Sequence, residues 1–272
     1  MKSNNLPMVL SVTSGKGGVG KTSISVNLAY CLSKLDKKVL LLDADLGLAN
    51  VDVMIGIAPK LNLFHLFNQN EPLQNIIVST KYGFDILPAA SGVSEMLSLN
   101  TGQKLELLEA MDYLEESIDY LIVDTGAGIN DNVIYFNLAV QQRLLVITPE
   151  PTSLTDAYAV IKILKTRHDI NRFKVVVNWA RTHQEARNIF KKLYSACDHF
   201  LSGVALELSG VIPFDQKVKQ GVTMQIPFCH YSENAPASRA LMNLSNTAIT
   251  WEPDKNLDGN IKFFWKKLLF QE

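Results

Sequence analysis

A glycine-rich stretch near the start of the sequence constrains the fold more than any other feature. It runs over residues 13–22 and matches the phosphate-loop pattern G-x-x-x-x-G-K-[ST] at Gly15, Gly20, Lys21 and Thr22. A short apolar run, residues 8–13, comes directly before the glycines, and residues 22–35 after them have helical periodicity. A buried strand, a glycine loop and a helix in this order are typical of an α/β fold with a parallel sheet.

The remaining sequence repeats this alternation of short apolar runs and longer helical stretches. It predicts strands at residues 8–13, 39–42, 84–87, 120–123, 144–148, 175–177 and 204–212. It predicts helices at residues 22–35, 104–116, 132–141, 153–166, 184–200 and 237–250. Because the strand runs are rich in Val, Ile and Leu with little polar alternation, we expect them to be buried on both faces. The prediction is an α/β P-loop NTPase with a mostly parallel central β-sheet and helices on both faces.

The domain organisation follows from the absence of a long Pro/Gly-rich linker between these elements. Residues 1–251 are predicted to form one P-loop ATPase domain. Residues 252–272 begin with a turn-prone polar stretch and are predicted to form a C-terminal appendage with an amphipathic helix.

Composition excludes several other classes of protein. Hydrophobic residues make up 47% and charged residues 19% of the chain, which excludes wholesale disorder. A net charge of −1 argues against a wholly basic surface, so no direct specific nucleic-acid binding is expected. No apolar run approaches the roughly 20 residues that span a bilayer, and the first residues lack a secretory signal. The widely spaced Cys31, Cys197 and Cys229 indicate reduced thiols, and a cytoplasmic location is expected.

The glycine loop supplies the groups that bind a triphosphate. Glycines allow successive backbone N–H groups to turn toward an anion, and the start of a helix adds partial positive charge. Lys21 is predicted to reach the β- and γ-phosphates, and the Thr22 hydroxyl to ligate Mg²⁺. The predicted ligand is therefore a nucleoside triphosphate with Mg²⁺, held in this loop by Gly15, Lys16, Gly17, Gly18, Val19, Gly20, Lys21, Thr22 and Ser23.

Two other interpretations of the loop stay open. Gly15, Gly17 and Gly20 also match the dinucleotide fingerprint, and Asp43 and Asp45 lie about where its ribose-binding acid would fall. That fingerprint has no use for a Lys-Thr pair after its last glycine, so the pattern favours a triphosphate. The remaining alternative is a glycine-rich turn without a ligand.

Acidic residues end two of the predicted strands. Asp43 and Asp45 follow residues 39–42, and Asp124 follows residues 120–123. Ligands of open α/β sheets lie beyond the carboxyl ends of the strands, so these acids are expected to face the loop. Asp124 fits a Walker B carboxylate for Mg²⁺, and Gly128 would bring a backbone N–H to the γ-phosphate. For each acid the alternative is a helix N-cap or a turn.

Residues 16–22 resemble the deviant Walker A motif of the MinD/ParA ATPases. The resemblance implies that Lys16 reaches the phosphates of the opposite subunit in a nucleotide-sandwich dimer. It also implies that Asp45 positions the attacking water while Asp43 supports the metal shell. The implied catalytic residues are thus Lys16, Lys21 and Asp45, and the implied metal residues are Thr22, Asp43 and Asp124. Around the adenine base, the resemblance implies Asn178, Pro213 and Asp215, although Asn178 is also explained as a turn amide.

Within this superfamily the sequence is most similar to the flagellar-number regulators, the FlhG/FleN branch. The similar segments are residues 43–53, 87–92, 150–158 and 259–264. Gly126 departs from the branch, which more often has Ala or Pro there. The resemblance implies a homodimer that forms with ATP and returns to monomer on slow hydrolysis. It implies two partners: a sigma-54-dependent flagellar activator and a signal-recognition-type GTPase that positions flagella.

The C-terminal segment has two interpretations. Ile261, Phe264, Trp265, Leu268 and Leu269 fall on one face of a predicted helix whose other side carries lysines. This pattern is typical of an anchor on a membrane surface, here the inner face of the cytoplasmic membrane or cell pole. The alternative is a helix that packs on its own domain, or one that does so only until the dimer forms.

Other functions remain as alternatives. Paired cysteines of an iron-protein reductase are missing from the sequence, which excludes that class. A cell-division ATPase of the MinD type would share the same loop, and a DNA-partition ATPase of the ParA type would favour a basic surface. A dinucleotide-binding module is the alternative that is not an enzyme.

Overall fold

The computed structural model describes residues 7–45, 50–69, 71–88, 108, 114, 117–252 and 264–266. The strands are β1 Met8–Ser14, β2 Val39–Ala44, β3 Val78–Ser79, β4 Asp85–Pro88, β5 Tyr120–Ala127, β6 Gln142–Ile147, β7 Arg172–Ala180 and β8 Ala205–Pro213. The helices are α1 Lys21–Lys34, α2 Val51–Ile55, α3 Leu63–Gln69, α4 Leu73–Ile76, α7 Asp131–Ala139, α8 Pro151–His168, α9 His183–Phe200, α10 Gln216–Thr223, α11 Phe228–Tyr231 and α12 Pro236–Ala248.

The strands form one 8-stranded sheet in the order β3-β4-β2-β5-β1-β6-β7-β8. All neighbours are parallel except β3 and β4, which are antiparallel. The first strand of the chain, β1, lies between β5 and β6 near the middle of the sheet. This confirms the predicted α/β class and the mostly parallel sheet.

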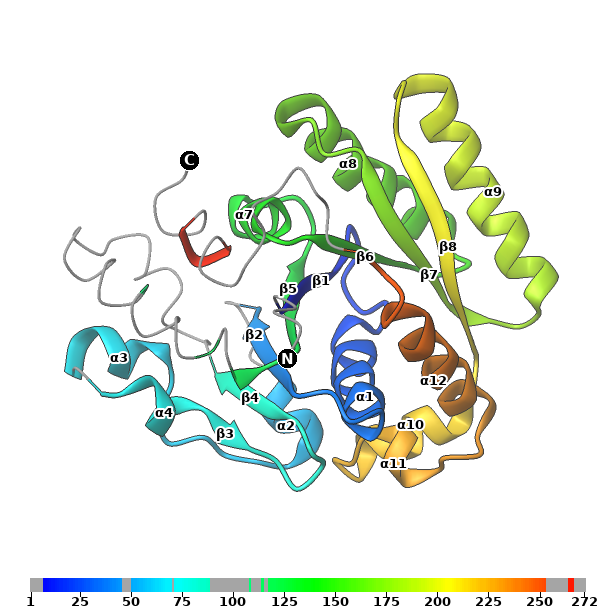
Figure 1. The fold of residues 1–272 in the computed structure, drawn as a ribbon. Coiled ribbons are helices and arrows are strands. Elements are labelled where there is room, and N and C mark those ends of the chain that lie inside the picture. Colours follow the sequence, from blue (N-terminus) through cyan, green and yellow to red (C-terminus); the bar gives the residue numbers. More distant parts are fainter. Residues whose placement is uncertain are drawn as a thin grey trace.

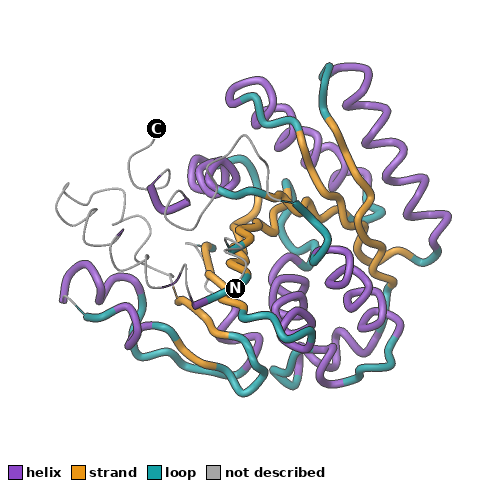
Figure 2. Tube along the Cα trace, in the orientation of Figure 1, coloured by secondary structure: helices purple, strands orange, loops and turns teal. Residues whose placement is uncertain are grey.

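Helices cover both faces of the sheet (Figures 1 and 2). One face packs against α1, α11 and α12, and the other against α7, α8 and α9. Successive residues of a strand alternate between the two cores: Leu144 and Val146 of β6 face α1 and α12, whereas Leu145 and Ile147 face α8. A strand with an apolar core on each side has to be apolar at nearly every position, which is the pattern that the sequence shows.

The predicted strands are all present, and the long helices differ from prediction by at most a few residues at each end. Prediction missed β3 and the short helices α2, α3, α4, α10 and α11. Elements of this length offer too few turns for a helical period to show in the sequence. The predicted helix at 104–116 lies outside the described residues apart from Leu108 and Leu114, which are both buried.

The described part of the C-terminal segment lies inside the hydrophobic core. Phe264 and Trp265 are both 0% exposed and belong to the same cluster as Phe136 of α7. The rings of Phe264 and Phe136 stack with their centroids 6.4 Å apart. This placement favours packing on the chain's own domain; Ile261, Leu268 and Leu269 lie outside the described residues.

Two further findings concern membrane-spanning helices and the cysteines. In the described part of the chain, no helix combines the length and the apolar character needed to cross a membrane. The three cysteines are buried free thiols, as the sequence predicts.

Candidate nucleotide-binding site

The carboxyl ends of the central strands meet at the glycine loop between β1 and α1. Parallel pairing places Asp43 of β2 beside Asp124 of β5, and Ser14 of β1 beside Ala127 of β5. The sheet register therefore brings together the acids that the sequence places at the ends of two strands.

The loop conformation depends on individual glycines. Gly18 and Gly20 have φ values of 74° and 93°, a backbone region that side chains disfavour. Gly20 is also the N-cap of α1, so the left-handed turn leads directly into the helix. Gly15 is required for packing instead, because a Cβ atom there would lie 2.1 Å from the carbonyl oxygen of Asp156 in α8. The loop thus begins against the backbone of a neighbouring helix.

Lys21, the first residue of α1, is a buried cation with acidic neighbours. The residue is only 7% exposed. Burial lowers the pKa of Lys21, while the charges of Asp124 and Asp45 act in the opposite direction. A phosphate group would add further negative charge beside this ammonium group, which favours its charged form.

Asp124 offers an oxygen that fits a metal ion. The residue is 1% exposed, and its Oδ1 accepts a hydrogen bond of 2.8 Å from the Ser25 hydroxyl. Its Oδ2 is buried and has no hydrogen-bond partner in the described part of the chain. Burial raises the pKa of Asp124 to about 6, against the opposing influence of nearby hydroxyl groups and Lys21. A free carboxylate oxygen and the hydroxyl of Thr22 are the hard oxygen ligands that Mg²⁺ prefers.

Asp43 holds the backbone that follows β2. Its Oδ2 accepts hydrogen bonds from the amides of Asn50 and Val51, at 3.1 and 3.2 Å, and its Oδ1 accepts one from Asp45 N at 3.3 Å. Burial and the charge of Asp124 raise the pKa of Asp43 to about 7. These hydrogen bonds are the ones expected of Asp43 as a turn or helix-capping residue. They hold the backbone in place at the start of α2.

Asp45 and Gly128 complete the site on the side of β5. Gly126 lies beside the Asp45 carboxylate, because an added Cβ atom would be in ordinary van der Waals contact with Asp45 Oδ1, at 3.5 Å. Gly128 has a φ of 98°, and its N–H donates to Ser14 O at 3.0 Å. The amide predicted for the γ-phosphate therefore donates its hydrogen bond to β1 in this structure.

Lys16 is held by the start of α8 in the same chain. Its Nζ donates to Glu150 Oε2 and, over 2.9 Å, to Thr152 Oγ1. The ion pair is partly exposed, with 34% of the lysine side chain and 49% of the glutamate side chain accessible. Lys16 therefore has an anionic partner within its own chain.

The residues predicted around the base lie at the ends of β7 and β8. Asn178 is buried; its amide donates to Val19 O at 2.8 Å, and its Oδ1 accepts from Trp179 N. Pro213 ends β8. Asp215 caps α10 through Lys217 N and also accepts from Ala237 N at the start of α12.

The sequence reasoning missed Ser25, Glu150 and Thr152 as site residues. Ser25 lies one helical turn after Lys21, where it shares the loop's face of α1, and that spacing was a usable signal. Glu150 and Thr152 come from the start of α8, which follows β6, and β6 lies beside β1 only through the sheet order. No local pattern connects them to Lys16.

Comparisons with known proteins identify the relatives of this arrangement. The family model described as "ParA: NUBPL iron-transfer P-loop NTPase" matches residues 5–249. The chain is 43% identical to the antiactivator FleN of Pseudomonas aeruginosa over 96% of its own length and 93% of that protein. It is 31% identical to the flagellum site-determining protein YlxH of Helicobacter pylori, over 96% and 89% of the two chains. A solved MinC:MinD cell division complex from Aquifex aeolicus matches with a TM-score of 0.72 and 27% identity, covering 91% of this chain and 98% of the other.

Fold and site together define a P-loop nucleoside triphosphatase with a parallel sheet. The chain belongs to the ParA family within that class, and it is an ATPase of the MinD/ParA type. This excludes the dinucleotide-binding module and the ligand-free turn as explanations of the glycine loop.

Proposed function

We propose that this ATPase is an ATP-dependent dimerisation switch that regulates flagellar number and placement. The observation that carries the proposal is the 43% identity to an antiactivator, FleN, across nearly the whole of both chains. Similarity to a flagellum site-determining protein supports the same process. We propose two partners: a sigma-54-dependent flagellar activator, and a signal-recognition-type GTPase that positions flagella.

The proposed chemistry is in-line attack of water on the γ-phosphate of ATP. Bound Mg²⁺ would neutralise charge on the phosphate oxygens, and Thr22 and the free Oδ2 of Asp124 would hold it. Lys21 offsets developing negative charge within the same chain, and Lys16 offsets it in the partner subunit. Asp45 orients the attacking water. The loop amides from Gly15 to Gly20 grip the phosphates.

The contact of Lys16 with Glu150 and Thr152 supports a switch with two states. To reach a phosphate on another subunit, Lys16 has to exchange these partners within its own chain. A triphosphate carries more negative charge than one carboxylate, so its presence favours the exchange. ADP lacks the γ-phosphate and favours return to the contact with Glu150.

Light scattering during size-exclusion chromatography tests the switch. The mass is expected to double with a non-hydrolysable ATP analogue and to remain that of a monomer with ADP. Lys16→Ala is expected to abolish dimerisation and hydrolysis while ATP still binds. Lys34→Ala, at the far end of α1, is the matched control and should behave as wild type. A monomeric Lys16→Ala protein with wild-type hydrolysis would exclude the role of Lys16 in the partner subunit.

Asp45→Ala separates binding from hydrolysis. Without a group to orient water, the variant is expected to bind ATP and to accumulate as a dimer. Malachite-green phosphate release and light scattering on one sample measure both properties. Rapid phosphate release would transfer the water-orienting role to another group, first of all Asp43.

The partner proposal needs its own experiment. Purified sigma-54-dependent activator is expected to lose transcription activity when this protein is added with ATP, and to keep it with the Lys16→Ala variant. Retained activity with the dimeric wild-type protein would contradict the flagellar assignment and leave the ATPase assignment intact.

For the C-terminal segment we propose that it packs on the domain in the nucleotide-free monomer and is released to a membrane surface on dimerisation. Deleting residues 260–272 is expected to weaken sedimentation with anionic lipid vesicles in the presence of ATP and to spare nucleotide affinity. Sedimentation that the deletion leaves unchanged would exclude the anchor.

A further inference from the structure

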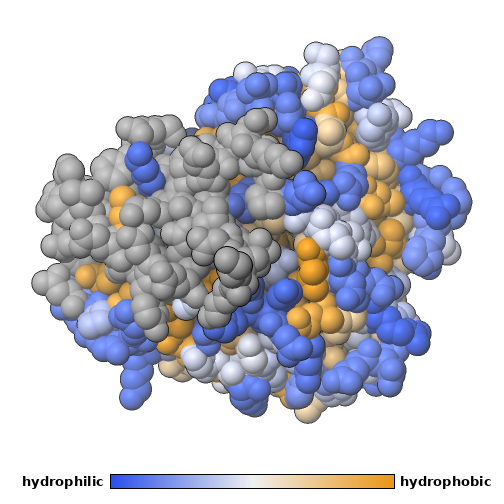
Figure 3. Space-filling view, viewed as in Figure 1, coloured by the Kyte–Doolittle hydropathy of each residue, from blue (hydrophilic) through white to orange (hydrophobic). Residues whose placement is uncertain are grey.

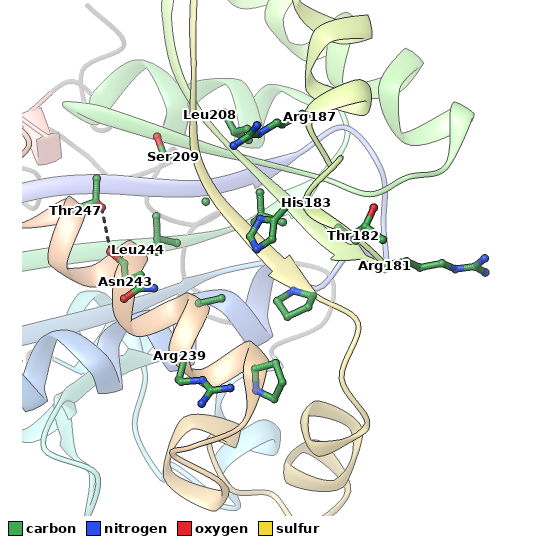
Figure 4. Close-up of a pocket in the computed structure, with 16 residues that line it drawn as sticks. Arg181, Thr182, His183, Arg187, Leu208, Ser209, Arg239, Asn243, Leu244 and Thr247 are labelled. Carbon is green, nitrogen blue, oxygen red and sulfur yellow. Dashed lines mark hydrogen bonds between the residues drawn. The ribbon is translucent and has the colours of Figure 1, made fainter. Parts of the chain in front are cut away.

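A cavity of about 540 Å³ lies along the outer edge of β8 and extends to Pro213 at the end of that strand. Its floor is the strand itself, at Leu208, Ser209, Gly210 and Val211. One wall is the start of α9 and the other is α12 (Figure 4). Seen from the side of Figure 1, a band of hydrophobic residues follows the position of β8 between hydrophilic ones (Figure 3).

The floor of this groove carries backbone groups that pair with no other strand. β8 is the last strand in the sheet order, and β7 is its neighbour on the inner side. Val175 pairs with Leu208 and Val176 with Gly210, so Ser209 is an extra residue that forms a bulge. In the described part of the chain, no backbone amide outside β7 bonds to the stretch from Leu208 to Val211. On either side of the bulge, the unpaired N–H and C=O groups of this edge form a template for an additional strand.

The walls of the groove are cationic. Arg187 of α9 and Arg239 of α12 lie on opposite walls, and Arg181 extends outward from the rim (Figure 4). Among the residues that the structure describes, the lining contains no Asp or Glu. None of the three arginines forms a salt bridge with any described Asp or Glu. The groove therefore has positive charge that an acidic ligand would neutralise.

We propose that this groove binds an extended acidic segment of a partner protein, which adds to the sheet beside β8. Main-chain hydrogen bonds to the open edge would supply affinity, and the arginines would select acidic side chains. Side chains of an added strand point alternately to the two faces of the sheet. Since Arg187 and Arg239 lie on opposite faces, two adjacent acidic residues would each meet one arginine. Apolar residues beside them would cover Leu208 and Val211.

Other occupants fit the groove less well. A second copy of β8 would bring its own arginines toward these, and like charges at short distance repel. Nucleic acid would satisfy the arginines through phosphates but would leave the strand edge and the apolar floor without partners. An extended acidic peptide would pair with the arginines, form hydrogen bonds with the strand edge and cover the apolar floor.

Selection from a random dodecapeptide library tests the proposal on the full-length protein. Enriched peptides are expected to contain adjacent Asp or Glu residues flanked by β-branched residues. The best peptide, synthesised with a fluorescein label, is then titrated by fluorescence anisotropy. The double variant Arg187→Glu/Arg239→Glu is expected to weaken its binding by about tenfold or more.

A matched variant separates site-specific loss from a general change of charge. Arg167→Glu/Arg172→Glu reverses two exposed arginines outside the groove and is expected to bind the peptide as wild type does. Arg187→Ala/Arg239→Ala provides a second test if the charge-reversed protein has a lower melting temperature. N-methylation of the peptide backbone, which removes N–H donors, is expected to abolish binding when it falls on the residues that pair with β8.

Four results would overturn the proposal. The first is enrichment of peptides that contain no acidic residues, and the second is equal peptide affinity for the wild type and the charge-reversed variant. The third is peptide affinity that N-methylation leaves unchanged at every position. The fourth is displacement of the bound peptide by duplex DNA. Nucleotide-dependent dimerisation is measured in parallel. A failure of the peptide-binding proposal can therefore be distinguished from a failure of the dimerisation proposal.

Discussion

The glycines of the phosphate loop serve different purposes even though they belong to one motif. Gly15 makes room for the backbone of α8, since an added Cβ atom would lie 2.1 Å from Asp156 O. Gly17 has no such neighbour, because the closest described atom to its added Cβ is Ala127 Cβ at 4.0 Å. A motif in the sequence does not separate glycines needed for packing from those needed for an anion.

Replacing these two glycines separates their roles. Gly15→Ala is expected to destabilise the nucleotide-free protein by about 1–3 kcal/mol or more, because backbone has to move. Gly17→Ala is the matched control and should leave the melting temperature unchanged. Differential scanning fluorimetry without nucleotide measures both. Equal melting temperatures for the two variants would show that α8 does not constrain Gly15.

Glu150 is expected to restrain dimerisation by holding Lys16. Glu150→Gln removes the negative partner, so Lys16 becomes easier to transfer to a phosphate. An exposed ion pair contributes about 1 kcal/mol at most, and the dimer releases one such pair in each subunit, which limits the gain in dimer affinity to about thirtyfold. Light scattering at graded concentrations of ATP analogue measures the gain.

The control for that experiment is a similar pair elsewhere. Lys174 and Glu207 form a partly exposed ion pair between β7 and β8, and Glu207→Gln should leave dimerisation unchanged. Weaker dimerisation of Glu150→Gln than of wild type would show that Glu150 supports the dimer instead of competing with it.

At the scale of elements, the C-terminal segment shows how context decides between two uses of one pattern. Its apolar stripe has the spacing of a membrane-surface helix, and this spacing is equally that of a helix facing a core. The structure buries Phe264 and Trp265 beside α7. Whether the segment packs on the core depends on whether α7 and its neighbours leave apolar surface uncovered. No pattern within residues 252–272 reveals this.

The burial of Phe264 has a measurable consequence for stability. Phe264→Ala is expected to cost about 3–5 kcal/mol, because a fully buried aromatic side chain leaves a cavity. Phe200→Ala is the matched control, since that ring is 67% exposed at the end of α9, and its effect should be small. Urea denaturation measures both free energies of unfolding. A small effect of Phe264→Ala would show that the segment leaves the core in solution.

At the scale of the whole molecule, the order of strands and helices was predictable because the sheet has an apolar core on each face. Every central strand therefore needs an apolar run in its sequence. Leu40, Leu41 and Leu42 of β2 are all buried, and the run is visible in the sequence. Two acids at the site were predictable for a related reason, since Asp43 and Asp124 each directly follow such a run. Contacts between distant segments, such as Lys16 with Glu150, depend on the sheet order and have no local signal in the sequence.

The paired carboxyl groups of β2 and β5 make the stability of the metal-free protein depend on pH. The pKa values of Asp43 and Asp124 are raised in the folded state to about 7 and about 6. The folded protein therefore retains protons that the unfolded chain releases near pH 4. Their contribution is fully present below about pH 4 and is lost as the pH rises through 6 and 7.

In EDTA the melting temperature is expected to fall between pH 5 and pH 8 by several degrees, since each pKa unit corresponds to about 1.4 kcal/mol. Asp124→Asn should flatten this dependence, because it removes one titrating group and the charge that raises the pKa of Asp43. The exposed Asp36→Asn variant is the control and should keep the wild-type slope. A melting temperature that rises over this range would contradict the raised pKa values.

The position of β1 in the sheet has a consequence for biosynthesis. Its neighbours are β5 and β6, so Met8 pairs with Tyr120 and Leu10 with Gln142. While the ribosome has made only about the first hundred residues, this strand, which is buried along its whole length in the folded protein, has neither partner. Non-local pairing of this kind is slow and leaves nascent segments prone to aggregate. A translating polysome would therefore present β1 to chaperones long before its partners emerge, and truncated products that end before β5 should be insoluble.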